Sequence, residues 1–141
     1  MNKIILTFLI FLPFHTYGDC LNDINNESDL LLSNICNYEF TILAKIESVS
    51  LKNKYNPFTY FKNHRVYTLN ALVKEPLKGN IKGTLCFVQW REEPFDNVYA
   101  MENNMYIISF NNNKDCSVIE VGSILKASEK LLKSGKNEQA K

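Results

Sequence analysis

The sequence predicts an all-β domain with flanking helices: a five-stranded, partly open Greek-key barrel between a short helix and a longer amphipathic one. Two observations predict this class. Five segments carry strand-type composition, most of them bounded by Gly, Pro or Asn turns, and the segment after them has helical apolar spacing. A β-sandwich needs about seven strands, and only five are found.

The chain opens with features of a signal peptide. Lys3 precedes the apolar run 4–14, which has the length of a signal-peptide apolar region and is too short to span a bilayer. Thr16 and Gly18 are small enough for the positions that signal peptidase reads, so we expect residues 1–18 to be removed and Asp19 to begin the mature chain. A buried N-terminal helix is the alternative, but Lys3 and the small residues lie where export needs them.

The remaining 123 of 141 residues suffice for one compact domain, expected over 19–134, with a disordered tail over 135–141. The chain has 16 Lys and Arg against 15 Asp and Glu, and Lys3 leaves with the leader, so the mature domain is neutral. Because a general phosphate-binding role needs a basic face, we expect no nucleic-acid partner. No later segment is long and apolar enough to be transmembrane.

Four cysteines follow the leader, and they predict two disulfides. An exported chain meets oxidising conditions, where an even cysteine count indicates disulfide bonds. Four cysteines allow three pairings, and spacing alone does not choose among them. A structural zinc site needs four clustered Cys or His ligands, whereas this chain has no CxxC pair and His64 is its only mature histidine. We therefore expect no metal of its own and no cofactor. The four are Cys20, Cys36, Cys86 and Cys116.

A short helix and a long strand begin the domain. Ser28 or Asp29 is a suitable helix start before three leucines, and the helix should last about two turns. Asn26 opens a glycosylation sequon, which matters only in a eukaryote. Residues 38–49 then alternate, interrupted by Leu43 and Val49, as in a half-buried strand of an antiparallel sheet. The inward face is expected to hold Phe40, Ile42, Ala44 and Ile46.

Four further strands and one helix complete the domain. Pro76 and Gly79 should end the second strand, and Gly135 should end the helix. The predicted strands cover 64–77, 84–90, 105–110 and 116–121, and the helix covers 124–133. Five short strands in this arrangement fit the OB type of barrel.

Candidate site residues are few, and none predicts catalysis. His64 is the only mature histidine, and the paired carboxylates Glu92 and Glu93 are loop neighbours that seldom converge on one substrate. Phe87 and Trp90 lie three apart, so in a regular strand they face opposite sides and one of them faces outward. If that one is Trp90, it could anchor an interface. The candidate partner-binding residues are Asp19, Cys20, Leu21, Trp90, Arg91 and Phe95.

Several segments, in order, resemble the tissue inhibitors of metalloproteinases and the wider netrin-like domain family, which includes bacterial exported TIMP-like proteins. "CNYEFTILAKIESV" resembles the first barrel strand of that family, and "VYTLNALVKEPLKGNIKG" its second strand with a Lys-Gly turn. "NNMYIISF" and "KDCSVIEV" resemble its fourth strand and the strand carrying a later cysteine. The resemblance covers about residues 19–133 and implies an OB-type barrel.

The resemblance also implies a disulfide pairing. In this fold a cysteine just before the first strand tethers the N-terminal segment to the barrel. By that analogy we expect Cys20–Cys86 with Cys36–Cys116, and the alternative is Cys20–Cys116 with Cys36–Cys86. The inhibitors carry six cysteines in this domain, so the resemblance does not choose between these two pairings.

The inhibitors of this family chelate a protease's catalytic zinc through the α-amine and carbonyl of a terminal, disulfide-bonded cysteine. Here Asp19 precedes Cys20, and an amide nitrogen is a poor zinc ligand. The Cys-x-Cys opening is also absent, because Leu21 and Asn22 follow. We therefore expect a non-catalytic binding module, secreted or periplasmic, that contacts a protein or glycan through barrel loops and its N-terminal segment. The alternative is a zinc-metalloprotease inhibitor acting through a terminal Cys20.

Overall fold

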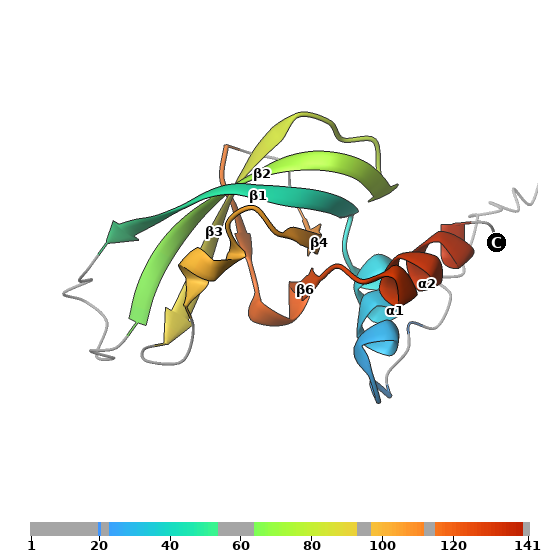
Figure 1. Ribbon diagram of the computed structural model, residues 1–141. Helices are drawn as coiled ribbons and strands as arrows, with labels where there is room; N and C mark the ends of the chain where they lie inside the picture. Colours follow the sequence, from blue (N-terminus) through green and yellow to red (C-terminus); the bar gives the residue numbers. More distant parts are fainter. Residues whose placement is uncertain (1–19, 21–22, 54–63, 93–96, 112–114, 140–141) are drawn as a thin grey trace, which may run out of the picture.

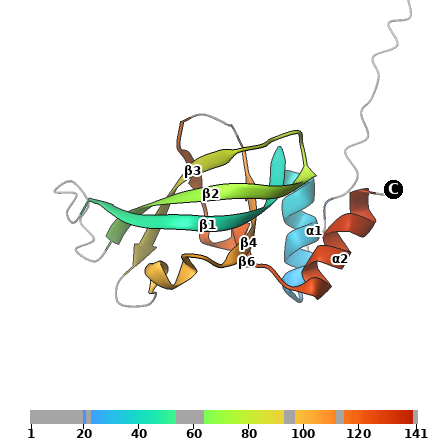
Figure 2. The ribbon, with the colours of Figure 1, turned by 45° about the horizontal axis from the view of Figure 1, so that its top comes forward.

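A single six-stranded sheet curls into a half-barrel, and two helices pack side by side at one end of it (Figures 1 and 2). The computed structural model describes residues 20, 23–53, 64–92, 97–111 and 115–139. The predicted leader, Asp19, Leu21 and Phe95 lie outside these residues. None of the described helices has the length and apolar character needed to cross a membrane.

The elements follow one another in the order helix, three long strands, and then shorter strands separated by 3-10 turns. They are α1 (Glu27–Asn37), β1 (Phe40–Asn53), β2 (His64–Lys78), β3 (Thr84–Glu92), η1 (Val98–Met101), β4 (Met105–Phe110), β5 (Ser117–Ile119), η2 (Val121–Ser123), β6 (Ile124–Lys126) and α2 (Glu129–Gln139). The predicted mainly β composition with a helix before and a helix after the strands is confirmed. The strand over Ile124–Lys126 was not predicted, because its residues were assigned to the start of the last helix.

The strand order in the sheet is β5-β3-β2-β1-β4-β6. The strands β1, β2 and β3 form an antiparallel meander, and β4 pairs with the other edge of β1. The prediction of a purely antiparallel sheet was wrong at one place, since β5 runs parallel to β3. The β1–β2 ladder has four register shifts. Because a bulge bends and twists its strand, these irregularities account for the curl.

The end of β2 differs from the prediction. Pro76 does not end the strand; it pairs with Ile42 beside the register shift between Thr41 and Ile42. The β3 partners of β2 stop at Leu72, so Pro76 lies where the strand has a neighbour on only one side, a position that tolerates proline. Gly79 follows the strand with a φ of 78°, and a Cβ there would lie 2.5 Å from Cδ1 of Phe40.

Both helices differ from their predicted bounds. Asn26, rather than Ser28 or Asp29, is the N-cap of α1, because its Oδ1 accepts from the Asp29 amide at 3.0 Å. The helix is 11 residues long, more than the two turns expected. Helix α2 begins only at Glu129 and continues through Gly135 to Gln139, into the predicted tail. Gly135 is buried where α2 meets α1: a Cβ added there would lie 3.5 Å from Cδ2 of Leu31.

Two apolar clusters lie on opposite faces of the sheet. The first fills the inside of the curl and includes the predicted inward residues Ile42, Ala44 and Ile46. The second lies between the sheet and the two helices and contains Leu43 and Leu31. The helices therefore explain why Leu43 interrupts the alternation of β1, since both faces of the strand are covered at this end.

Three aromatic rings span the inside of the curl. Phe110 of β4 stacks on Phe40 of β1 with ring centroids 5.4 Å apart, and it meets Phe87 of β3 edge-on at 4.9 Å. Two strands separate β3 from β4 in the sheet order. The contact between Phe87 and Phe110 therefore crosses the interior of the half-barrel and joins strands that do not pair.

Candidate functional site

The disulfides join Cys20 to Cys36 and Cys86 to Cys116, with Cα–Cα distances of 5.8 and 4.5 Å. Both pairings implied by the family resemblance are therefore wrong. The parallel pairing of β5 with β3 is the physical reason, because its register places Phe87 opposite Ser117 and so brings the preceding cysteines together. Cys20 is left to bond Cys36 in the last turn of α1.

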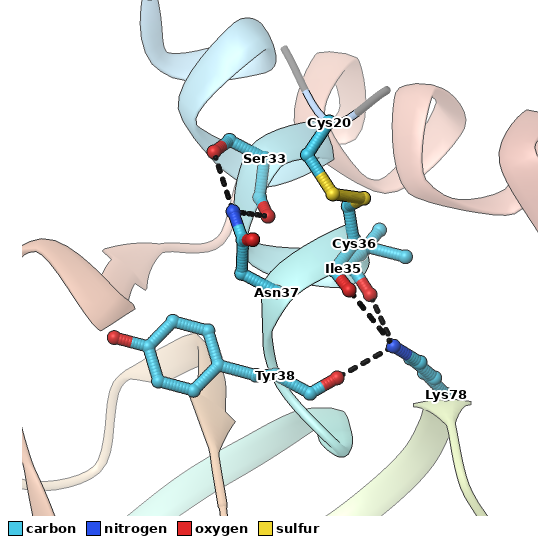
Figure 3. The surroundings of a disulfide bond; sticks show 7 residues. All are labelled: Cys20, Ser33, Ile35, Cys36, Asn37, Tyr38 and Lys78. Atoms are coloured by element: carbon cyan, nitrogen blue, oxygen red, sulfur yellow. Dashed lines mark hydrogen bonds between the residues drawn. A yellow bond between two sulfur atoms is a disulfide. The ribbon is translucent and has the colours of Figure 1, made fainter. Parts of the chain in front are cut away.

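The Cys20–Cys36 disulfide anchors the N-terminal segment to the C-terminal end of α1, rather than to the β3 strand (Figure 3). Close to it, the Asn37 side-chain amide donates to the Ser33 carbonyl at 2.9 Å. The Lys78 ammonium from the end of β2 donates to the carbonyls of Ile35 and Tyr38, each at 2.5 Å (Figure 3). No basic residue lies in the last turn of α1 itself, so Lys78 supplies from another element the cation that favours a helix C-terminus.

Lys78→Met should lower the free energy of unfolding by about 1–2 kcal/mol, because it leaves part-buried helix-end carbonyls without their charged donor. Methionine keeps most of the apolar length of the side chain, so the loss reports the ammonium group. Urea unfolding followed by circular dichroism measures it. Lys82→Met, at an exposed turn position, is the matched control and should change stability by less than about 0.5 kcal/mol. Equal stabilities for the two variants would contradict the capping role.

The outer face of β3 carries an apolar surface that we call the outer patch, defined by Trp90, Val66 and Val118. Trp90 is 43% exposed, whereas Phe87 is fully buried, as their spacing of three required. Val66 pairs directly with Trp90 on β2, and Val118 on β5 is 66% exposed. Strand alternation places Cys86 on this same face. The disulfide thus fixes the edge strand β5 beside the exposed tryptophan.

Arg91, a candidate partner-binding residue like Trp90, lies on the opposite face of β3 from Trp90. Along the inner face the order is Phe87, Gln89 and Arg91, and Arg91 lines a half-open cavity of about 210 Å³ at one end of the curl. We call this cavity the interior pocket. Its lining comes from β3, η1 and the segment before it, β4 and β6, and consists of Arg91, Asn97, Val98, Ala100, Met101, Tyr106 and Ile124.

The polar groups of the interior pocket are arranged around Arg91 and Tyr106. Burial raises the pKa of the Tyr106 phenol, and the Arg91 guanidinium opposes that shift. Both side chains line the pocket, and with its raised pKa the phenol is protonated at neutral pH. Gln89 is fully buried one inward position away from Arg91, and among the described residues its amide nitrogen and oxygen have no hydrogen-bond partner.

The described residues contain no group of three or more His, Cys, Asp or Glu side chains placed to hold a metal ion. Asn26, the predicted glycosylation residue, is exposed, and its side-chain nitrogen donates to Asp29 at 3.0 Å. Sequence reasoning missed Gln89, Asn97 and Tyr106. A glutamine at an inward strand position was the available signal, because the polar side chain falls where alternation predicts an apolar one. No protein-family model matches the chain, and no curated protein does either.

Proposed function

We propose that the chain is an exported, non-catalytic binding module of TIMP-like or netrin-like type, secreted or periplasmic. The observation that carries the proposal is the outer patch, with a large exposed aromatic residue on a strand that a disulfide braces. Buried aromatic residues dominate the energetics of interfaces when a partner covers them. A rigid strand lowers the conformational entropy lost when the partner binds.

The strand order supports the OB-type part of this proposal. The meander β1-β2-β3 is extended by β4 beside β1 and by β5 parallel to β3, and the contact between Phe87 and Phe110 joins β3 to β4 across the curl. A partly open OB-type Greek-key barrel, with β5 and β6 as its edge strands, accounts for this arrangement. Barrels of this type bind oligosaccharides and oligonucleotides on an outer strand face and its loops. The net charge of the chain, only +1 at pH 7, favours a protein or glycan over a nucleic acid as partner.

Trp90→Ala should weaken binding of the partner at least tenfold, because it removes the largest exposed apolar side chain of the outer patch. Trp90 is the only tryptophan of the chain, so a change in its emission on titration with glycans or candidate proteins identifies a partner that covers it. Calorimetry then compares the affinities of wild type and variant. Tyr99→Ala is the control, because Tyr99 is similarly exposed, at 49%, but lies on η1. An unchanged affinity of Trp90→Ala for such a partner would contradict the proposal.

The second candidate function, inhibition of a zinc metalloprotease, has one specific observation in its favour. Cys20 is bonded to Cys36 at the end of a packed helix, which is the rigid anchor that chelation requires. Chelation also requires that Cys20 carry the terminal amine, because only an amine nitrogen is a good zinc ligand. A mature chain that begins at Asp19 excludes this function, and one that begins at Cys20 supports it.

A further inference from the structure

We propose that the interior pocket binds a carboxylate that carries a short aliphatic chain. The pocket lies on the inner face of β3, whereas the outer patch lies on the other face, so this inference goes beyond the binding function proposed above. It does not depend on the resemblance to any family. It depends on the polar groups, apolar walls and size of the pocket.

The polar end of the pocket suits a carboxylate. Arg91 supplies a planar guanidinium whose five N–H donors match the two oxygens of a carboxylate. Tyr106 supplies a phenol, which is protonated at neutral pH and can therefore donate a hydrogen bond. Asn97 adds an amide to the lining. Among the described residues that line the pocket none is an Asp or Glu.

Gln89 is the second observation that points to a ligand. Its side chain is completely buried, yet neither its amide nitrogen nor its oxygen has a hydrogen-bond partner in the described part of the chain. Leaving a buried polar group unpaired costs about 1–3 kcal/mol. On β3 it lies between Phe87, which belongs to the apolar core, and Arg91, which lines the pocket. Gln89 is not among the residues that line the pocket, so a ligand bound there would reach this amide through a retained water.

The apolar walls and the volume of the pocket determine which chain the carboxylate can carry. Val98, Met101 and Ile124 are apolar, and each is at most 8% exposed. The volume of about 210 Å³ corresponds to roughly seven water molecules at about 30 Å³ each. It is smaller than the roughly 300–1,000 Å³ of sites for drug-sized ligands. A chain of about three to five carbons fits, either as a free short-chain acid or as the terminal residue of a peptide.

Titration of the folded, disulfide-intact protein with butyrate, followed by two-dimensional ¹H–¹⁵N NMR, tests the proposal. We expect saturable shifts of the Gln89 side-chain amide, the Arg91 Nε–H and the Asn97 side-chain amide. Butyramide, which has the same shape without the charge, should bind at least tenfold more weakly, and sodium chloride at equal ionic strength should give no saturable shift. N-acetyl-glycyl-valine and its C-terminal amide form a second pair of ligands. Comparing them tests whether the pocket binds the C-terminal carboxylate of a peptide.

Binding of butyrate supports a free acid as ligand, and binding of the peptide acid alone supports a chain terminus. No saturable shift at the pocket with either acid, or equal binding of butyramide and butyrate, would overturn the proposal.

Arg91→Gln should weaken binding at least tenfold, and Arg91→Lys, which keeps the charge but loses the planar fork, should weaken it less. Lys82→Gln removes a charge at an exposed position and should change the affinity less than twofold. The Trp90 emission spectrum reports whether each variant is folded, and partner binding through the outer patch should be unaffected.

Discussion

Replacing Cys86 and Cys116 together by alanine should lower the free energy of unfolding by about 3–4 kcal/mol. The disulfide closes a loop of 30 residues, and the chain-entropy relation gives about 3.6 kcal/mol for that length at 25 °C. It also holds β5, which is only three residues long, against the edge of the sheet. A loss of this size is a large part of the roughly 5–15 kcal/mol by which small domains are stable. Urea unfolding of wild type and variant measures the difference.

The second disulfide provides the comparison for this experiment. Cys20→Ala with Cys36→Ala opens a loop of 16 residues and should cost about 3 kcal/mol by the same relation. It should leave the emission of Trp90 unchanged, because Cys36 lies in α1 and Trp90 on the outer face of β3. The Cys86/Cys116 variant should alter that emission, since β5 and its exposed Val118 are then less firmly held. A loss below about 1 kcal/mol for the Cys86/Cys116 variant would contradict the stabilising role argued here.

Phe110→Ala should lower the free energy of unfolding by about 3–5 kcal/mol, the usual cost of removing a buried ring from a core. Phe110 is 1% exposed and contacts both Phe40 and Phe87. It is therefore the ring through which β4 reaches across the curl to β3. Thermal and urea unfolding, followed by circular dichroism, give the change in stability.

Two further variants distinguish the loss of the Phe110 ring contacts from the loss of buried apolar volume. Phe110→Leu keeps an apolar side chain at the site and should cost clearly less than the alanine variant. Phe40→Ala removes a ring that is only partly buried and should also cost less. If Phe110→Ala costs no more than Phe40→Ala, the aromatic contact across the interior does not hold the curl, and this part of the account is wrong.

The sequence was most informative where a local pattern decides the structure. The bounds of β2 and β3 were predicted within one or two residues, because Gly and Asn turns and β-type composition mark them. The inward set on β1 was also predicted, since alternation survives on the face that lines the curl. At the helix-covered end of β1 the pattern was ambiguous, because Leu43 packs under α1 and α2.

The features that depend on distant contacts were not predicted. The disulfide pairing follows from the parallel register of β5 on β3, which no local pattern encodes. The N-cap of α1 depends on two hydrogen bonds between Asn26 and Asp29. From the sequence alone, Ser28 was an equally plausible helix start. Helix α2 continues through Gly135 because the residue packs against Leu31, so a close helix contact overrides the low helix propensity of glycine.

The candidate site was predicted in part. The spacing of Phe87 and Trp90 required that one face outward, and the structure assigns that role to Trp90. The same alternation sends Arg91 inward, so Arg91 and Trp90, both candidate partner-binding residues, lie on opposite faces of β3. The interior pocket was missed because its lining comes from four separate parts of the chain, which only the curl of the sheet brings together.

Mass spectrometry of the protein recovered from the exported fraction and digested without reduction determines both its N-terminus and its disulfide pairing. We expect a mature N-terminus at Asp19 and two cystine-linked peptides, one joining Cys20 to Cys36 and the other joining Cys86 to Cys116. Unpaired thiols, a link between Cys20 and Cys86, or an exported chain that still carries residues 1–18 would contradict this expectation.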